Sequence, residues 1–462
     1  MKAMVIAIGN PRDLAVLALR DREGNVSGNI ERRVASAGLP PADAHLAFEL
    51  ALGVERRRAS LEAIARGYLA QPGRALPGAL NQIVAVALYQ LLYLERVPAF
   101  AAVNEAVEQA ARFHHRRQSG LVNGLLRTIA RKVSQVQRGP VPAATDVIPV
   151  APESYRRSEA PVFPDPAASP AAYLAAAYSL PMELAERWIA NLGSLDEAVA
   201  AATHANVRAP LIVRVNLAQT SVEAVLAELA AAGVKARPHE NGLSIVLDDT
   251  RDVTRLDAFA RGAIQPQDPT ATGVVLACGP RPGMKVLDLC AAPGTKTTHL
   301  AELMGNKGSI VAADVSREKL DRIADNCRRM GITIVQPILA DAVGSLEGGG
   351  FDLVLADVPC SNTGVLARRA EARWRFSAEA LSKLVEDQKF LARAAGHFAR
   401  PGGRLVYSTC SIEPQENAEI ARWLAQTEPQ LRLAREELTL PAGAADAAAW
   451  RDGGYLALFE AN

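Results

Sequence analysis

Two cysteines lie in similar surroundings, each just past a short apolar run that is typical of a strand. The first is in DVPCSNTG at residues 357–364 and the second in YSTCSIEP at residues 407–414. Each motif puts a thiol, Cys360 or Cys410, among small polar residues, where a thiol can be reactive. A buried structural thiol is the usual interpretation of a single cysteine, and we apply it to Cys278 and Cys327.

A pair of reactive thiols suits chemistry at an unactivated aromatic carbon such as C5 of cytosine. That carbon is a poor nucleophile until another nucleophile adds at C6, and covalent catalysis of this type calls for cysteine. The proton at C5 must then leave so that the thiol can be eliminated, which a second thiol or a carboxylate can assist. An acid near N3 would stabilise the adduct. With Asp357 beside the first cysteine, the sequence supplies all these groups.

A turn that could hold a cofactor lies in KVLDLCAAPGTKTTHL, residues 285–300. The pattern predicts a strand, a tight turn and the start of a helix, and in an open α/β sheet ligands bind at such turns. Its small residues allow close approach of a ligand. The spacing matches neither a dinucleotide fingerprint nor a P-loop, which disfavours phosphate binding. A small polar cofactor fits, and an ordinary connection without a ligand is the alternative.

Three acidic residues follow predicted strands in the same part of the chain. Strands and helices alternate from about residue 261 to the end, which predicts a doubly wound, Rossmann-like α/β sheet. Asp314, Asp341 and Asp357 end strands of this sheet and should share the rim that carries the turn. Asp314 follows Gly294 by twenty residues (314 − 294), about the offset at which a carboxylate binds ribose hydroxyls. One such acid is more often a helix cap, but three favour a ligand site.

Residues 1–138 are predicted to form an all-helical domain, because helix-forming apolar blocks alternate with Pro and Gly. No acidic residue occurs between Gln109 and Thr145. The basic residues of this stretch are Arg112, Arg116, Arg117, Arg127, Arg131, Lys132 and Arg138. Such a face attracts phosphates, and Phe113, His114 and His115 could stack on bases. We therefore favour RNA binding over the alternative, a solvated face balanced by acids elsewhere.

The middle of the chain is less informative. Residues 139–171 are rich in proline and predict an extended linker. Residues 172–265 predict a helical stretch followed by a small α+β unit of the RRM or ferredoxin-like kind, either an RNA platform or a packing domain. Residues 266–462 form the predicted catalytic domain. After Cys360, Arg373 and Trp374 belong to a basic, aromatic loop that could hold a target strand, or could be a solvated loop packed on one Trp.

Length and composition set the remaining limits. A chain of 462 residues is expected to form about three domains. Its formal net charge is +1, so any polyanion site must be local. Five cysteines without a C-x-x-C pair favour reduced thiols in the cytoplasm over disulfides or a metal site. No long apolar segment predicts a membrane span. We expect a cytoplasmic monomer that binds no metal.

These motifs resemble known families over nearly the whole chain. LYQLLY at 88–93, AVNEAV at 102–107 and GLVNGLLR at 120–127 are similar to the helical RNA-binding domain of the antitermination factor NusB. From Gln267 to the end, the chain resembles the RNA cytosine-C5 methyltransferases that use S-adenosylmethionine. With its NusB-like front it resembles their RsmB (Sun/Fmu) type, which modifies 16S ribosomal RNA. The resemblance implies methyl transfer to C5 of a cytosine through a covalent adduct of Cys410 with C6.

The resemblance also implies roles for individual residues. Cys410 matches the nucleophile, Cys360 the cysteine that releases the product, and Asp357 the acid that opens the first cysteine motif. Asp314 and Asp341 match the acids at the ribose and the adenine. The cofactor loop is matched by Cys290, Ala291, Ala292, Pro293, Gly294, Thr295 and Lys296.

The chain departs from the family pattern without losing a reactive group. The family usually has Gly at Thr295, Ala at Val358, Gly or Ala at Asn362, and Glu at Pro269. Transfer RNA or 23S ribosomal RNA are alternative substrates with the same chemistry. A non-catalytic RNA-binding or assembly factor is the alternative from another class.

Overall fold

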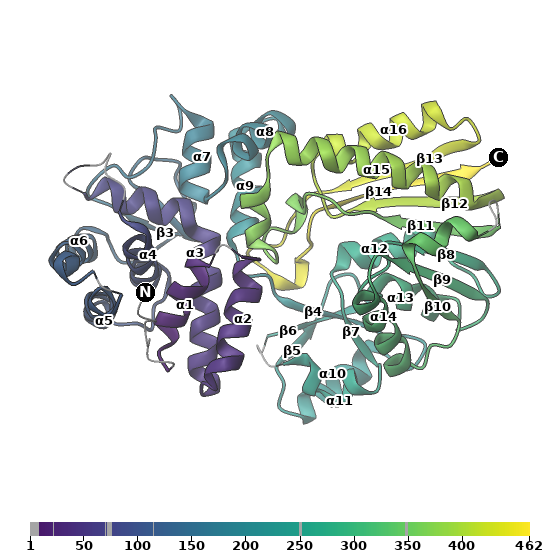
Figure 1. Ribbon diagram of the computed structural model, residues 1–462, viewed down its shortest axis with the longest axis horizontal. Coiled ribbons are helices and arrows are strands. Elements are labelled where there is room, and N and C mark those ends of the chain that lie inside the picture. The colour runs from purple at the N-terminus through teal and green to yellow at the C-terminus, as the bar shows by residue number, and fades with distance from the viewer. Residues whose placement is uncertain are drawn as a thin grey trace. The chain divides into compact units, whose positions relative to one another are not determined.

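The computed structural model describes residues 9–21, 23–69, 71, 76–113, 115–248, 252–346 and 350–462. His114, a stacking candidate of the sequence, lies outside these ranges. The chain forms two compact units (Figure 1). The first comprises residues 1–207 together with 369–375, and the second comprises 208–368 and 376–462.

The first unit is largely helical, as predicted. Its first six helices are α1 (Pro11–Arg20), α2 (Val26–Ala37), α3 (Pro41–Gly67), α4 (Gly78–Tyr93), α5 (Ala99–Arg112) and α6 (Ser119–Lys132). Helix α6 buries Val122, Leu125, Leu126 and Ile129, a spacing that places all four on one face. The basic residues of α6 are consequently left on its opposite, solvent side.

The expectation of an extended linker over residues 139–171 is wrong. Strands β1 (Gln137–Arg138), β2 (Val147–Ala151) and β3 (Ser154–Arg157) form an antiparallel sheet in the order β1-β3-β2. Val147 and Ile148 are fully buried. Pro149 is tolerated because β2 is an edge strand, where one backbone donor can be missing.

Three further helices complete the first unit: α7 (Pro170–Tyr178), α8 (Met182–Leu192) and α9 (Leu195–Asn206). Ser60 donates a hydrogen bond to the carbonyl of Ala177 at 3.0 Å, and the amide of Ala59 donates to Ser179 Oγ at 2.8 Å. These bonds join α3 to the end of α7. The helical part of the expected middle domain therefore packs with the first unit.

A small antiparallel sheet opens the second unit. Its order is β5-β6-β4-β7, and its elements are β4 (Leu211–Val215), α10 (Val222–Ala231), β5 (Ala236–Pro238), β6 (Ser244–Leu247), α11 (Asp257–Ala260) and β7 (Ile264–Pro266). Val213 and Ile245 pack with Val225 and Leu229 of α10. The succession of strand, helix and hairpin agrees with the predicted α+β unit.

A seven-stranded sheet in the order β10-β9-β8-β11-β12-β14-β13 forms the rest of the second unit. The parallel strands are β8 (Lys285–Leu289), β9 (Ser309–Asp314), β10 (Val335–Leu339), β11 (Phe351–Asp357) and β12 (Ala399–Thr409); β13 (Leu431–Thr439) and β14 (Gly454–Ala461) complete it as antiparallel strands. The helices of this part are α12 (Pro269–Cys278), α13 (Thr295–Leu303), α14 (Arg317–Met330), α15 (Ala378–Phe398) and α16 (Ala418–Thr427). The strand order reverses between β8 and β11, and ligands bind at such switch points. No helix in the described ranges has the length and apolarity of a membrane span.

Candidate active site at the carboxyl ends of the strands

The two cysteines of the sequence motifs meet at this rim. Asp357 of β11 pairs in register with Ser408 of β12, so the turns after the two strands leave the sheet side by side. Cys360 Sγ and Cys410 Sγ are 3.0 Å apart, and both thiols are free. Cys360 is buried and Cys410 is half-buried. The hydrogen bond with Cys410 and burial raise the pKa of the Cys360 thiol well above its usual value.

Asn362 shapes the turn that carries Cys360. Its φ of 63° lies in the left-handed region, which Gly and Asn adopt more readily than other residues. The Asn362 amide nitrogen donates to the carbonyl of Cys360 at 2.7 Å, and Asn362 Oδ1 accepts from Cys410 Sγ at 3.4 Å. Asn where the family usually has Gly or Ala is thus compatible with the turn and adds a contact to the second cysteine.

A half-buried ion pair lies beside the thiols. Lys296 Nζ donates to Asp357 Oδ2 at 2.6 Å, and Ser408 Oγ donates to Asp357 Oδ1 at 2.8 Å. Burial alone would lower the pKa of Lys296, but the charge of Asp357, supported by Cys410, leaves that pKa raised. The Lys296 ammonium therefore places a positive charge close to Cys410.

The cofactor turn is held to the end of β9. Asp314 Oδ2 accepts a hydrogen bond from the amide of Ala292 at 3.0 Å, and Asp314 Oδ1 accepts from Lys319 Nζ at 2.9 Å. Gly294 has φ 92°, and a Cβ there would lie 3.2 Å from Ile323 Cα. Burial, followed by nearby carboxylates, raises the pKa of Cys290 to about 12, which keeps this thiol protonated.

Asp341 shares the rim but stands apart from these contacts. Leu339 of β10 pairs with Asp314 of β9, and Asp341 follows two residues later in a 3₁₀ turn with its side chain exposed. The structure thus brings the turn at residues 290–296 together with Asp314, Asp357 and the two cysteines, and leaves Asp341 at the solvent edge.

Asp288 was not singled out in the sequence, although a carboxylate within an apolar strand was a visible signal. Thr297 Oγ1 donates to Asp288 Oδ2 at 2.6 Å, while Asp288 Oδ1 is buried without a hydrogen-bond partner among the described residues. Burial raises the pKa of Asp288 to about 7. Glu416 and Gln388, which lie behind the cysteines, also escaped sequence reasoning.

The basic stretch of the first unit divides into two groups. Arg112 binds Asp13 at 2.9 Å and Glu105 at 2.5 Å, and Lys132 pairs with Glu159 at 3.2 Å. Arg112 is therefore part of the helix packing, contrary to the expectation of an RNA contact. The remaining basic residues are exposed and make no ion pair with a described residue: Arg116, Arg117, Arg127, Arg131 and Arg138.

Arg373 is not exposed for an RNA strand as the sequence suggested. Its side chain is fully buried, and its guanidinium donates to the carbonyls of Ala370, Arg56, Ser179 and Ala205 and to Asn206 Oδ1. Trp374 Nε1 donates to the carbonyl of Glu55 at 3.1 Å, and the guanidinium of Arg58 lies 5.2 Å from the Trp374 ring centroid. Both side chains anchor residues 369–375 within the helical unit.

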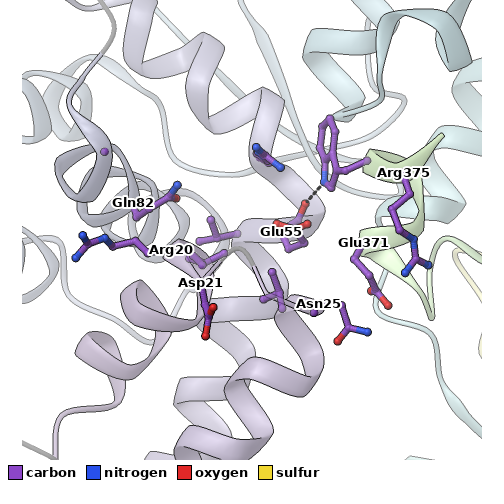
Figure 2. Close-up of a pocket in the computed structure, with 14 residues that line it drawn as sticks. Arg20, Asp21, Asn25, Glu55, Gln82, Glu371 and Arg375 are labelled. Atoms are coloured by element: carbon purple, nitrogen blue, oxygen red, sulfur yellow. Dashed lines mark hydrogen bonds between the residues drawn. The ribbon is translucent and has the colours of Figure 1, made fainter. Parts of the chain in front are cut away.

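A cavity of about 570 Å³ lies next to Trp374 (Figure 2). Arg20, Glu55 and Gln82 line it from the helices, and Glu371 and Arg375 from the segment 369–375. Its charged lining residues balance, with three basic and three acidic: Arg20, Arg58, Arg375, Asp21, Glu55 and Glu371. None of the cysteine-site residues lines this cavity.

Three family models match successive parts of the chain. Residues 275–449 match the family described as 16S rRNA methyltransferase RsmB/F, residues 10–131 match the NusB family, and residues 180–254 match an RsmF/B-like ferredoxin-like domain. The last match includes α8 and α9, although these helices pack with the first unit.

Similar proteins cover nearly the whole chain. A probable ribosomal RNA small subunit methyltransferase B of Synechocystis is 33% identical over 431 residues, 90% of this chain and 89% of that protein. The ribosomal RNA small subunit methyltransferase B of Salmonella paratyphi B is 30% identical over 88% of this chain and 87% of its own length. The crystal structure of PH0851 shares the fold, with a TM-score of 0.73 at 24% identity over 99% of this chain and 100% of that one.

Proposed function

Because the chain belongs to the ribosomal RNA small subunit methyltransferase B family, we propose that it methylates C5 of a cytosine in 16S ribosomal RNA. Family membership makes it an S-adenosylmethionine-dependent methyltransferase of small-subunit ribosomal RNA that carries a NusB-type RNA-binding domain. The observation that carries the finer proposal is the contact of two free thiols, Cys360 and Cys410, at 3.0 Å. Methylation of an exocyclic amino group requires no thiol.

The residues at the rim suit S-adenosylmethionine. Carboxylates such as Asp314 and Asp341 can accept hydrogen bonds from ribose hydroxyls and the adenine amino group. The small residues of the turn, Ala291 to Gly294, allow its backbone to approach a ligand closely. When bound, S-adenosylmethionine supplies an electrophilic methyl group.

We assign the nucleophile to Cys410. Its sulfur adds to C6 as the thiolate and gives C5 the electron density needed to accept a methyl group, with the ammonium of Lys296 close by. A base in a stacked helix shields C6, so the target is expected in single-stranded or flipped-out RNA.

We assign product release to Cys360. After methylation, the C5–H electrons restore the C5–C6 double bond as the C6–S bond breaks. Cys360 can pass its proton to the departing sulfur of Cys410, 3.0 Å away, and take up the proton lost from C5. Both sulfurs then end as thiols.

The first test uses unmodified 16S RNA, labelled S-adenosylmethionine and bisulfite sequencing. Wild type should protect one cytosine, and Cys410→Ala should abolish that protection. Cys327→Ala, which changes a buried thiol of α14, should retain it. Label in transfer RNA or 23S RNA, and none in 16S RNA, would show that the labelled RNA is the substrate instead. Full protection of the cytosine by Cys410→Ala would refute the proposed nucleophile.

The second test concerns the adduct. Cys360→Ala keeps the nucleophile but lacks the release step, so denaturing gels should show a covalent protein–RNA band well above wild type. The double variant Cys360→Ala/Cys410→Ala should lose this band. If Cys360→Ala gives no more adduct than wild type, the release role is wrong.

A further inference from the structure

A single buried carboxylate joins the two cysteine motifs. Glu416 follows Cys410 by six residues (416 − 410), in the turn Pro414–Glu416, and its side chain is fully buried. The Glu416 carboxylate accepts hydrogen bonds from the Ser361 amide at 2.8 Å, from Ser361 Oγ, and from Ser411 Oγ at 2.5 Å. Ser361 directly follows Cys360, and Ser411 directly follows Cys410. Glu416 therefore holds the residue next to each thiol.

Neighbouring bonds make this junction rigid. Gln388 Nε2 of α15 donates to Glu416 at 2.9 Å and to the carbonyl of Pro359 at 2.9 Å. Ser361 Oγ and Ser411 Oγ are 3.1 Å apart. Tyr407 of β12 donates its hydroxyl to the backbone carbonyl of Glu416 at 2.7 Å. Helix α15, strand β12 and both cysteine turns therefore meet at one residue.

Burial of the Glu416 carboxylate carries a desolvation cost. No lysine or arginine of the described ranges forms an ion pair with Glu416, so hydrogen bonds alone stabilise this buried group. Burying a charge without a counterion costs far more than burying an amide. A glutamine would reach the same atoms but has only one acceptor oxygen, whereas both oxygens of the carboxylate accept hydrogen bonds here.

We propose that Glu416 is the positioning residue of the cysteine pair, holding the two thiols in contact for product release and placing a negative charge beside Cys360. This inference rests on the proposed function for the meaning of that release step. The geometry and the thiol chemistry can be tested without RNA.

The charges around the pair differ from one thiol to the other. Cys360 faces Cys410, Glu416 and Tyr407, and Glu416 is one of the groups that raise the pKa of Cys360, after contact with Cys410 and burial. On the other side, Cys410 faces Lys296, which is paired with Asp357. The two thiols therefore lie beside charges of opposite sign.

The charge can be tested through alkylation of the free protein. Iodoacetamide labelling across a pH series, read for each cysteine peptide by mass spectrometry, gives a midpoint for Cys360 that does not depend on its accessibility. Glu416→Gln should lower this midpoint by about one pH unit, the usual effect of removing a nearby like charge. An unchanged Cys360 midpoint would overturn the electrostatic part.

The positioning can be tested with the oxidant diamide, which takes one hydrogen from each thiol and leaves a Cys360–Cys410 disulfide. Glu416→Gln should form it at least as fast as wild type, because glutamine keeps the length and part of the bonding while Cys360 loses its proton more readily. Glu416→Ala should form it at least several-fold more slowly. Equal rates in all three proteins would overturn the positioning part.

A matched control tests whether the loss of any buried carboxylate in the second unit would change the thiol measurements. Glu302→Gln also neutralises a buried carboxylate of the second unit, one paired with Arg214 rather than with a cysteine turn. It should leave both thiol measurements unchanged. In methyl transfer, Glu416→Ala should lower kcat and leave KM for RNA unchanged, and Glu416→Gln should recover part of the loss. Shifted thiol profiles without methyl transfer by wild type would keep this inference and reject the proposed function.

Discussion

At the scale of single residues, the site is defined by charges held in buried surroundings. Lys296 remains an ammonium because Asp357 accepts its hydrogen bond at 2.6 Å. Within the described ranges, Asp288 has no cation in hydrogen-bond contact, and its carboxyl group accepts a hydrogen bond at one oxygen only, from Thr297. Burial therefore favours the protonated form of Asp288, and its pKa rises to about 7. Asp288 joins β8 to α13 through its hydrogen bond with Thr297, and its raised pKa makes the stability of the fold depend on pH.

Asp288→Asn should reveal that cost. Below about pH 4 the carboxyl is protonated in both folded and unfolded chains. Between pH 4 and 7 the unfolded chain releases its proton and the folded one does not, so wild-type stability falls by about 1.4 kcal/mol per pH unit. The asparagine side chain does not titrate in this range. The unfolding free energy of Asp288→Asn relative to wild type should therefore rise by a few kcal/mol from pH 4 to pH 7.

Urea unfolding at several pH values from 4 to 8 measures the difference directly. Thr297→Val is a useful companion, because it removes the hydrogen bond and leaves the titrating group in place. A difference between Asp288→Asn and wild type that stays constant with pH would contradict the raised pKa.

At the scale of elements, the cofactor turn is a compact joint between β8, β9 and α14. Gly294 is the N-cap of α13 in the left-handed region, and its α-carbon faces the backbone of Ile323 on α14. The amide of Ala292 is held by Asp314 at the end of β9. The turn is therefore shaped by both neighbours before a ligand binds.

Gly294→Ala should disturb this joint. A side chain at φ 92° is strained, and its Cβ would lie 3.2 Å from Ile323 Cα, so α14 must shift. We expect a loss of about 1–2 kcal/mol in unfolding free energy. Binding of S-adenosylmethionine, measured by calorimetry, should weaken several-fold. Gly305→Ala is the control, because its φ is also positive, at 61°, but its Cβ would meet no atom within 4 Å.

The limits of sequence-based prediction also appear among the elements. The strands, their acidic ends and the two cysteine turns follow from local patterns, and the cysteines meet because β11 and β12 are neighbours. The burial of Arg373 could not be foreseen, since its carbonyl partners at Ala205 and Arg56 lie 168 and 317 residues away in the chain. Glu416 was overlooked for a related reason: its contact with Ser361 spans 55 residues. The hairpin of residues 147–157 was hidden by prolines that an edge strand tolerates.

At the scale of the whole molecule, the net charge is close to zero, but positive charge is concentrated in one stretch of the helical domain. The net charge is +1, yet Arg116, Arg117, Arg127 and Arg131 are exposed on the last turns and helix of the NusB-like domain. Arg112 and Lys132 of the same stretch are paired with acids. We propose that the four exposed arginines bind phosphates of the RNA, and that sequence and chemistry are read elsewhere. Phosphate contacts position a nucleic acid without specifying its bases.

Replacing these four arginines with glutamine should weaken RNA binding in a salt-dependent manner. Each lost phosphate contact should reduce the slope of log K against log salt by about 0.7–0.9. A slope measured by fluorescence anisotropy with 16S RNA should therefore fall by as much as about 3 when all four contacts are lost. At saturating RNA, kcat should stay near wild type, because the cysteine site is intact. Arg322→Gln serves as the control, since Arg322 is exposed on α14 and paired with Glu318. An unchanged slope in the fourfold variant would show that this helical face does not bind the RNA backbone.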